Sequence, residues 1–304
     1  MKKRLLTTIA VGAITALALA GCSSSGSGDS AGSGDGGSNS GGKKDLKIAV
    51  FSGWAEGEAT SYLWQQVLED KGYNVDLESA TAGPVFTGVS QGDYDVTFDV
   101  WLPNTHKKYW EKYGDKLEDI GSWYKNAPLT IAVNKDAPID SLADLAANAD
   151  KFDNKIVGIE PGAGETGVVK DSVIPKYGLD KMEFQTSSTA AMLAALKKAT
   201  KDGTNIAVTL WKPHWAYNAF PIKDLKDPKG ALGKPDHIDV VGRTGFKKEY
   251  PQLTKWFKNF SFPDEKLADL ENKMFNSGAD ESDYPDIVKK WMKSNQDFVD
   301  GLTS

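Results

Sequence analysis

Short apolar runs alternate with segments of helical periodicity along this chain, and that alternation limits the folds open to it. Lys47–Phe51 reads KIAVF, and Glu58–Asp70 then carries apolar residues at helical spacing. This segment stops at Lys71-Gly72, where the glycine suits a C-terminal helix cap. Strand-like segments that alternate with helical ones predict an α/β fold with a mainly parallel sheet.

The alternation occurs in two successive units, and the chain from Glu249 onward is helical in pattern. Further strands are expected at Asn74–Leu77, Tyr94–Trp101, Leu129–Val133, Lys155–Ile159, Met182–Gln185, Ile206–Leu210 and Ile238–Val241. Two units predict two lobes: Asp45–Ala127 with Val240–Ser304 as lobe one, and Pro128–Asp239 as lobe two. A ligand is then expected in the cleft between the lobes, outside the carboxyl ends of the strands.

Residues 1–21 are expected to be a signal peptide. The basic start Met1–Arg4 precedes the apolar run Leu5–Ala20, which falls short of the ~18 or more apolar residues of a membrane-spanning helix. The run ends Leu19-Ala20-Gly21-Cys22, which resembles the lipobox of bacterial lipoproteins. That resemblance implies an extracytoplasmic protein held at the cell membrane by a lipid on Cys22. An ordinary secretory signal with an incidental cysteine is the alternative.

The segment that follows Cys22 is expected to be a flexible linker up to residue 44. Residues 23–44 are almost entirely Ser, Gly, Asp, Asn, Ala and Lys, which cannot bury apolar surface. A Gly-rich chain of this length has an r.m.s. reach of roughly 25 Å. The net charge of −6 is spread without a basic stripe, which argues against nucleic acid as a partner.

Three tryptophans share one sequence context, the carboxyl end of a predicted strand. Trp54 follows the first strand after Ser52-Gly53, whereas Trp101 ends YDVTFDVW and Trp211 ends IAVTLW. Trp101 and Trp211 each stand two residues before a proline, which turns the chain away after the aromatic residue. We therefore expect all three indoles to face the cleft.

A glycine-rich turn between a strand and a helix offers a place for an anion. Ile159–Gly167 reads IEPGAGETG, with backbone N–H groups at the start of the helix available to a negative charge. The segment lacks the Gly-Lys-Ser/Thr ending of a P-loop and the third glycine of a dinucleotide fingerprint.

Indole faces together with an anion seat suit a zwitterion that carries a quaternary ammonium and a carboxylate. A trimethylammonium group has no N–H, so cation–π attraction of about 0.5–2 kcal/mol per ring is its means of recognition. The ligand carboxylate would accept hydrogen bonds from His106 and from the backbone N–H groups of Gly164 and Glu165.

Four segments resemble one family, the glycine betaine/proline betaine substrate-binding proteins of ABC transporters (OpuAC type). They are GWAEGEATSYLWQQVLEDKGY, FDVWLPNTHKKYWEKYGDKLEDIGSWY, GIEPGAGETGV and LWKPHWAYNAFPIKDLKDP. The resemblance runs from about Asp45 to the C-terminus. It implies a two-lobed, periplasmic-binding-protein-like fold of type II and an importer component that binds glycine betaine or a related solute for osmoprotection. The implied partner is an ABC permease in the membrane.

The resemblance also implies roles for individual residues. The family's aromatic box falls on Trp54, Trp101 and Trp211. Its carboxylate contacts fall on the backbone of Gly164 and Glu165, with His106 as the side-chain donor. The residues do not rank glycine betaine against proline betaine, and a carnitine- or choline-type ligand stays open.

The sequence has no pattern that favours an enzyme, a metal or a cofactor. Gly-x-Ser-x-Gly and His-Glu-x-x-His are absent, and the three histidines have no metal-site spacing. The alternatives are a sugar-binding lipoprotein or a secreted glycosidase, since Trp-lined clefts also hold sugars. A glycosidase would need a carboxyl pair about 5–9.5 Å apart, for which Asp95 and Asp99 are the candidates.

Overall fold

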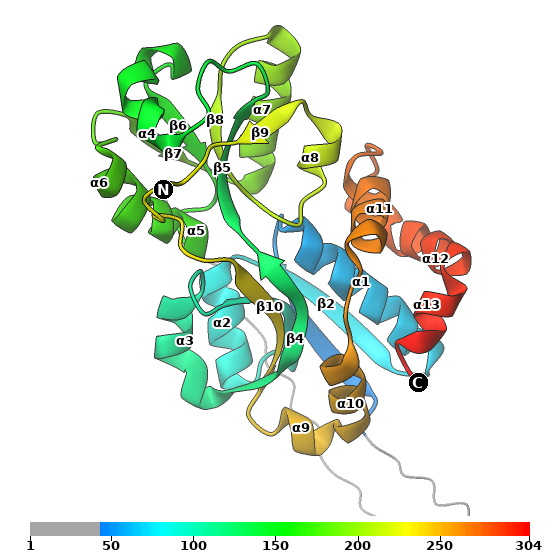
Figure 1. Ribbon diagram of the computed structural model, residues 1–304. Helices are drawn as coiled ribbons and strands as arrows, with labels where there is room; N and C mark the ends of the chain where they lie inside the picture. The colour runs from blue at the N-terminus through cyan, green and yellow to red at the C-terminus, as the bar shows by residue number, and fades with distance from the viewer. Residues whose placement is uncertain (1–42) are drawn as a thin grey trace, which may run out of the picture. The chain divides into compact units, whose positions relative to one another are not determined.

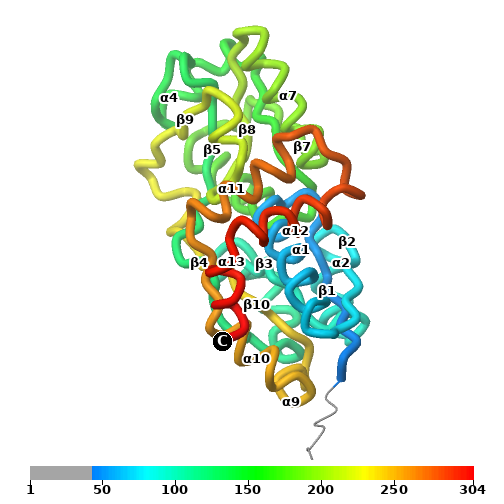
Figure 2. The backbone as a smooth tube through the Cα atoms, turned by 90° about the vertical axis from the view of Figure 1, so that its right-hand side faces the viewer, coloured from blue at the N-terminus to red at the C-terminus, as the bar shows by residue number. Residues whose placement is uncertain are grey.

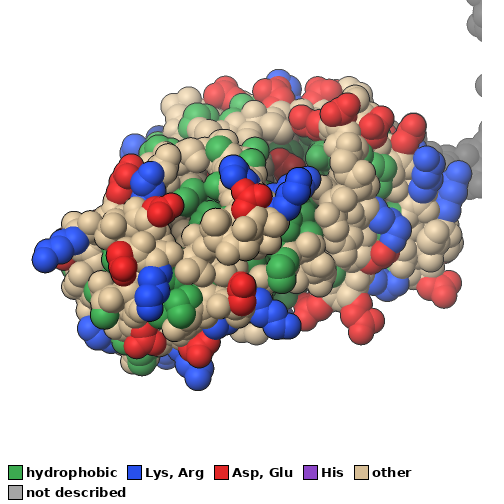
Figure 3. Space-filling model, turned by 90° about the horizontal axis from the view of Figure 1, so that it is seen from above, with side chains coloured by type: hydrophobic (Ala, Val, Ile, Leu, Met, Phe, Trp, Pro, Cys, Tyr) green, Lys and Arg blue, Asp and Glu red, His purple; other side chains and the backbone are tan. Residues whose placement is uncertain are grey.

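The computed structural model describes residues 43–304. The expected signal peptide, Cys22 and the linker up to residue 42 lie outside the described residues. From residue 43 onward the chain forms two mixed β-sheets, each flanked by helices and each forming the centre of one lobe (Figure 1). Between residues 43 and 304, no helix has both the length and the apolar composition needed to cross a bilayer. Basic and acidic side chains are interspersed over the face of the molecule shown in Figure 3.

The sheet of lobe one has the strand order β2-β1-β3-β10-β4. Its strands are β1 (Asp45–Phe51), β2 (Asn74–Ala80), β3 (Val96–Leu102), β4 (Leu117–Ala127) and β10 (Asp236–Arg243). β1 pairs in parallel with β2 and β3, whereas β10 runs antiparallel to β3 and β4. All residues of β3 are buried, because this strand lies in the middle of the sheet and is covered on both faces.

The helices of lobe one come from both ends of the described chain. They are α1 (Ala55–Asp70), α2 (Ala82–Gln91), α3 (Lys107–Tyr113), α9 (Phe246–Glu249), α10 (Pro251–Asn259), α11 (Asp264–Phe275), α12 (Tyr284–Ser294) and α13 (Gln296–Gly301). α11 and α12 pack on α1, so the C-terminal tail covers the first helix of the lobe (Figure 2). The expected end of α1 is confirmed: Gly72 has φ +80°, a left-handed conformation that suits glycine.

The sheet of lobe two has the order β7-β6-β8-β5-β9. Its strands are β5 (Leu129–Asn134), β6 (Lys155–Gly158), β7 (Glu183–Thr186), β8 (Ala207–Trp211) and β9 (Ile222–Asp224). Its helices are α4 (Leu142–Leu145), α5 (Gly164–Val168), α6 (Ile174–Tyr177), α7 (Thr189–Asp202) and α8 (Ala216–Ala219). β6 is parallel to β7 and β8, whereas β5 is antiparallel to β8 and β9.

The expectation of a mainly parallel sheet is wrong, because both sheets are mixed. Parallel neighbours need a crossover, usually helical, and β1, β2 and β3 are joined in that way. β5 and β10 instead enter their sheets from the other lobe without a helical crossover. They add to the sheets in the antiparallel direction.

The chain passes between the lobes twice, and the two passages lie side by side. β4 is followed by Pro128 alone before β5 begins, and the chain returns between β9 and β10. Asp236, the first residue of β10, pairs with Ala127, the last residue of β4. Because β10 belongs to the lobe-one sheet from Asp236 onward, we propose that lobe one resumes there. The sequence pattern placed that boundary at Val240, inside the strand.

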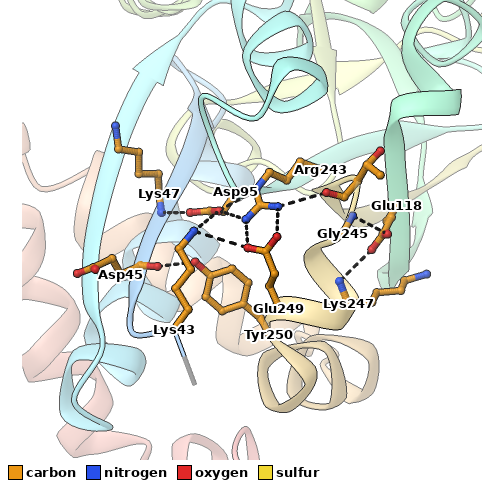
Figure 4. Close-up of polar contacts among 11 residues, drawn as sticks. Lys43, Asp45, Lys47, Asp95, Glu118, Arg243, Gly245, Lys247, Glu249 and Tyr250 are labelled. Carbon is orange, nitrogen blue, oxygen red and sulfur yellow. Dashed lines mark hydrogen bonds and ion pairs between the residues drawn. The ribbon is translucent and has the colours of Figure 1, made fainter. Parts of the chain in front are cut away.

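A network of ion pairs ties β10 and α9 to the start of the described chain (Figure 4). The Arg243 guanidinium donates to Asp95 at 2.9 Å and to both carboxylate oxygens of Glu249, at 3.0 and 2.5 Å. Asp95 also accepts the backbone N–H of Lys47 in β1, and Lys43 forms an ion pair with Asp95. The Arg243 and Asp95 side chains are only 13% and 9% exposed, so this contact is largely shielded from water.

We expect Arg243→Ala to lower the free energy of unfolding by about 2–4 kcal/mol, because it leaves the Asp95 carboxylate partly buried and underpaired. Urea denaturation at pH 7 measures the change. Lys47→Ala is the matched control, since its ion pair with Glu78 is about half exposed and contributes about 0–1 kcal/mol. Equal stability losses in the two variants would contradict a structural role for the Arg243 network.

Candidate functional site

A small cavity lies between the lobes, at the carboxyl ends of β1, β3 and β8. The structure brings all six sequence-predicted residues to it: Trp54, Trp101, His106, Gly164, Glu165 and Trp211. The free space inside the cavity is small, about 20 Å³.

Trp101 is the last residue but one of β3, and Trp211 is the last residue of β8, so one comes from each lobe. Each is followed by a turn through a cis proline peptide. The indole N–H of Trp101 donates to Asp99 Oδ1 at 2.7 Å, and that of Trp211 donates to Glu56 Oε2 at 2.8 Å. Both indoles are thus held by a buried carboxyl group behind them. Their ring faces remain available to the cavity.

Trp54 precedes α1 and is held by stacking instead of by a hydrogen bond. Its ring stacks on Phe51 with centroids 4.8 Å apart and lies 5.5 Å from the His106 ring. The ring of Trp211 approaches Trp54 edge-on, with centroids 6.5 Å apart and an angle of 67°. The rings of Trp54 and Trp211 are therefore turned at a large angle to one another beside the same cavity.

His106 is fully buried, and its hydrogen bonding fixes the tautomer. The backbone N–H of Trp101 donates to His106 Nδ1 at 2.9 Å, so the ring proton must sit on Nε2. Nε2 is buried and has no hydrogen-bond partner among the described residues. Burial lowers the pKa of His106 to about 3, so the ring is a neutral donor at physiological pH.

The turn that carries His106 is held by Asp236 at the passage between the lobes. The Asp236 carboxylate accepts the backbone N–H groups of Asn104 and Thr105, at 2.7 and 2.9 Å. It also accepts from the Thr105 hydroxyl at 2.6 Å and from the Asn104 amide at 2.9 Å. One buried side chain thus positions the whole turn after Trp101.

Lobe two touches this turn closely at Gly164. A Cβ atom on Gly164 would lie 2.2 Å from the carbonyl oxygen of Thr105, so the approach requires glycine. Tyr109 from lobe one donates to the carbonyl of Gly162 at 2.8 Å, and Lys108 pairs with Asp171 at 2.6 Å. The lobes are therefore in direct contact around the cavity.

α5 begins at the cavity wall. Gly164 and Glu165 are its first two residues, so their backbone N–H groups have no partner within the helix. The Glu165 side chain is 2% exposed, and both carboxyl oxygens lack hydrogen-bond partners among the described residues. Burial raises the pKa of Glu165 well above its ordinary range, so this carboxyl is held neutral.

Sequence reasoning missed Glu56 at this site and weighed Asp99 only as a catalytic carboxylate. Acidic residues are rarely fully buried unless they are paired, so composition gave no reason to place either behind an indole. The signal for Asp99 lay in spacing, since it stands two residues before Trp101 on one strand face. Glu56 accepts from Trp211 of the other lobe, a contact that no spacing in the sequence indicates. Asp95 does not join them, because it is paired with Arg243. The proposed Asp95–Asp99 pair is therefore not a shared site.

Two α/β lobes with a small cavity between them are typical of a periplasmic-binding-protein-like fold. Residues 44–294 match the OpuAC family, described as the substrate-binding domain of the ABC-type glycine betaine transport system. The chain belongs to this family, whose members are substrate-binding components of transporters.

Individual relatives agree with that assignment. The glycine betaine/carnitine transport binding protein GbuC of Listeria monocytogenes is 36% identical over 165 residues, which are 54% of this chain and 52% of that protein. The match thus spans about half of that relative's length. The glycine betaine/proline betaine-binding periplasmic protein of Escherichia coli is 26% identical over 280 residues, covering 79% of this chain and 83% of that protein.

Solved structures extend the likeness over most of the chain. Lactococcal OpuAC in its closed form with glycine betaine has a TM-score of 0.79 at 29% identity, covering 86% of this chain and 100% of that one. The glycine betaine, L-proline-binding protein (ProX) of Borrelia burgdorferi has a TM-score of 0.80 at 29% identity, covering 86% of this chain and 97% of that one. A choline-binding protein in complex with choline has a TM-score of 0.74 at 25% identity, covering 84% and 89%.

Proposed function

We propose that this protein is the extracytoplasmic solute-binding component of an ABC importer and binds glycine betaine or a related quaternary ammonium zwitterion. The main support for this proposal is that three indoles from the two lobes line one small cavity together with a histidine N–H that has no partner among the described residues. Trp54, Trp101 and Trp211 surround the trimethylammonium group in this proposal. Each ring contributes about 0.5–2 kcal/mol of cation–π attraction, more in a dry cavity.

The carboxylate of the ligand would lie at the other side of the cavity. His106 Nε2–H and the N–H groups of Gly164 and Glu165 donate to it, which is a charge-assisted arrangement. A neutral Glu165 carboxyl adds no repulsion there. The donors come from both lobes, so a bound zwitterion favours the closed arrangement.

The proposed cellular role follows from family and sequence together. A lipid on Cys22 and a linker with roughly 25 Å of reach would keep the receptor near its permease at the outer face of the cell membrane. The receptor hands the solute over without chemical change, and we therefore propose no catalytic activity. Uptake of such a solute serves osmoprotection.

Isothermal titration at pH 7 is the test of the ligand class. Glycine betaine should bind saturably, and choline more weakly, because choline has no carboxylate for His106 and the start of α5. Proline betaine and carnitine in the same series rank the zwitterions. Binding of maltose with no heat from millimolar glycine betaine would overturn the proposal, and equal affinities for choline and glycine betaine would refute the carboxylate contacts.

Trp101→Ala should weaken glycine betaine binding by about 2- to 30-fold, the equivalent of one cation–π contact. Trp101→Phe should lose less, because a smaller ring face remains. Titration calorimetry measures both. Trp256→Phe is the control: Trp256 is buried in α10, does not line the cavity, and should leave affinity unchanged. An unchanged affinity in Trp101→Ala would show that the box assignment is wrong.

Cys22→Ser should release the full-length protein from the membrane fraction into the soluble extracytoplasmic fraction, because the thiol that carries the lipid is gone. Cell fractionation followed by immunoblotting measures the distribution. Ser23→Ala, one residue further along, should stay with the membrane. Retention of the Cys22→Ser variant in the membrane fraction would argue against lipidation at this position.

A further inference from the structure

Two buried carboxyl groups lie behind the indole box, and each accepts the N–H of one ring. Asp99, in the middle of β3, accepts from Trp101 at 2.7 Å, and Glu56, in the first turn of α1, accepts from Trp211 at 2.8 Å. Asp99 and Glu56 are each 1% exposed. The orientation of two of the three rings therefore depends on these two acids.

Asp99 lies against the first turn of α1, which carries Glu56, and the charge of Glu56 is among the causes that raise the pKa of Asp99. A Cβ atom on Gly57 would lie 2.4 Å from Asp99 Oδ2, so only a glycine lets the helix approach the carboxyl this closely. Asp99 Oδ2 is buried and has no other hydrogen-bond partner among the described residues. Two carboxylates so close in a dry site cannot both be ionised without strong repulsion.

We propose that Glu56 and Asp99 share a single proton and act as a positioning pair for the indole box, and that closing the lobes on a ligand takes up this proton. The inference rests on the proposed function for its ligand. With one proton between them the two groups keep one negative charge, which complements a quaternary ammonium in the box. A second negative charge would have no counterpart.

Proton uptake is coupled to lobe closure because Glu56 and the indole that donates to it belong to different lobes. Glu56 and Asp99 belong to lobe one, whereas Trp211 belongs to lobe two, so the hydrogen bond from Trp211 to Glu56 exists only when the lobes meet. Opening removes that indole and admits water to Glu56. In the closed arrangement burial raises the pKa of Glu56 to about 8, and burial with the charge of Glu56 raises that of Asp99 well above its usual range.

The difference in pKa between the closed and the open state fixes the direction of the pH effect. The closed state holds the proton more tightly than the open state, so closure is favoured at pH values where the proton is available. Binding should weaken as pH rises from the ordinary range of a glutamate towards about 8. The dependence ends at the pH where the shared proton is lost in the closed state as well.

Other titratable groups lie near the pair, and proton uptake by them has to be distinguished from proton uptake by the pair. Glu58, on the same helix, has a pKa raised by burial to about 7 and accepts the N–H of Gly53. Glu165 from α5 and Glu271 from α11 are held neutral by burial, as is Tyr124 from β4, whose pKa is raised. His106, with its pKa near 3, stays neutral throughout the window. Glu58 needs a control, and so does Glu165, because it lines the cavity and would meet water when the lobes open.

Calorimetric titration of the full chain with glycine betaine between pH 6 and 9, in buffers of different ionisation enthalpy, tests the proposal. The wild type should take up as much as one proton per ligand near pH 7, and Kd should rise by no more than about tenfold per pH unit, the limit for one proton. Binding without proton uptake in this range would overturn the coupling.

Glu56→Gln replaces the shared proton with a permanent amide N–H while its oxygen still accepts from Trp211. Glu56→Gln should abolish proton uptake and flatten the pH profile of Kd. Asp99→Asn, which changes the other member of the pair, should have the same effect. Glu58→Gln and Glu165→Gln should each retain the wild-type slope. A slope that survives in both pair variants, or that disappears only in Glu58→Gln or only in Glu165→Gln, would assign the proton elsewhere and overturn the proposal.

Failure of the proposed function would be recognised separately, as absence of betaine binding at every pH. The pair is then tested by ¹³C NMR titration of the carboxyl groups with whichever solute of the calorimetric series does bind, maltose included, because the raised pKa belongs to the closed state. A carboxyl resonance that titrates above the ordinary acidic range and disappears in both Glu56→Gln and Asp99→Asn supports the shared proton. Ordinary titration of every carboxyl group overturns it.

Discussion

Four hydrogen bonds to one buried carboxylate, Asp236, hold the geometry of this site together. They fix the turn at Asn104 and Thr105, which follows Trp101 and carries His106. The same residue opens β10 and pairs with Ala127, so the passage between the lobes and the cavity wall share one anchor. The Thr105 carbonyl that this anchor positions is the surface against which Gly164 of lobe two closes.

The two Trp-x-Pro segments show how one local device serves both lobes. Each places an indole at the end of a central strand and a neutral histidine in the following turn, with Nδ1 accepting a backbone N–H. His106 accepts from Trp101, and His214 accepts from Ala216 at 3.0 Å. Burial lowers the pKa of His214 to about 3, as for His106. The site thus combines neutral donors on one side with buried acids on the other.

Much of this arrangement could be predicted from the sequence because it rests on local context. Strand ends that carry Trp54, Trp101 and Trp211 lead to one cleft in any open α/β lobe, and the structure places them there. β4 was not predicted from the sequence, because its buried residues are three or four positions apart: Leu117, Ile120, Trp123 and Ala127. Register shifts against β10 break the two-residue alternation that would have identified the strand. The antiparallel direction of β5 and β10 was not predicted either, because it depends on the lobe from which each strand enters its sheet.

The paired passages at Ala127 and Asp236 give the two lobes a common axis of rotation. Leu129, the second residue beyond that axis on the way into lobe two, already lines the cavity. A solute in the cavity therefore lies close to that axis, whereas the outer parts of both lobes lie far from it. If the lobes turn about these passages, a small displacement at the cavity becomes a larger one at their outer surfaces.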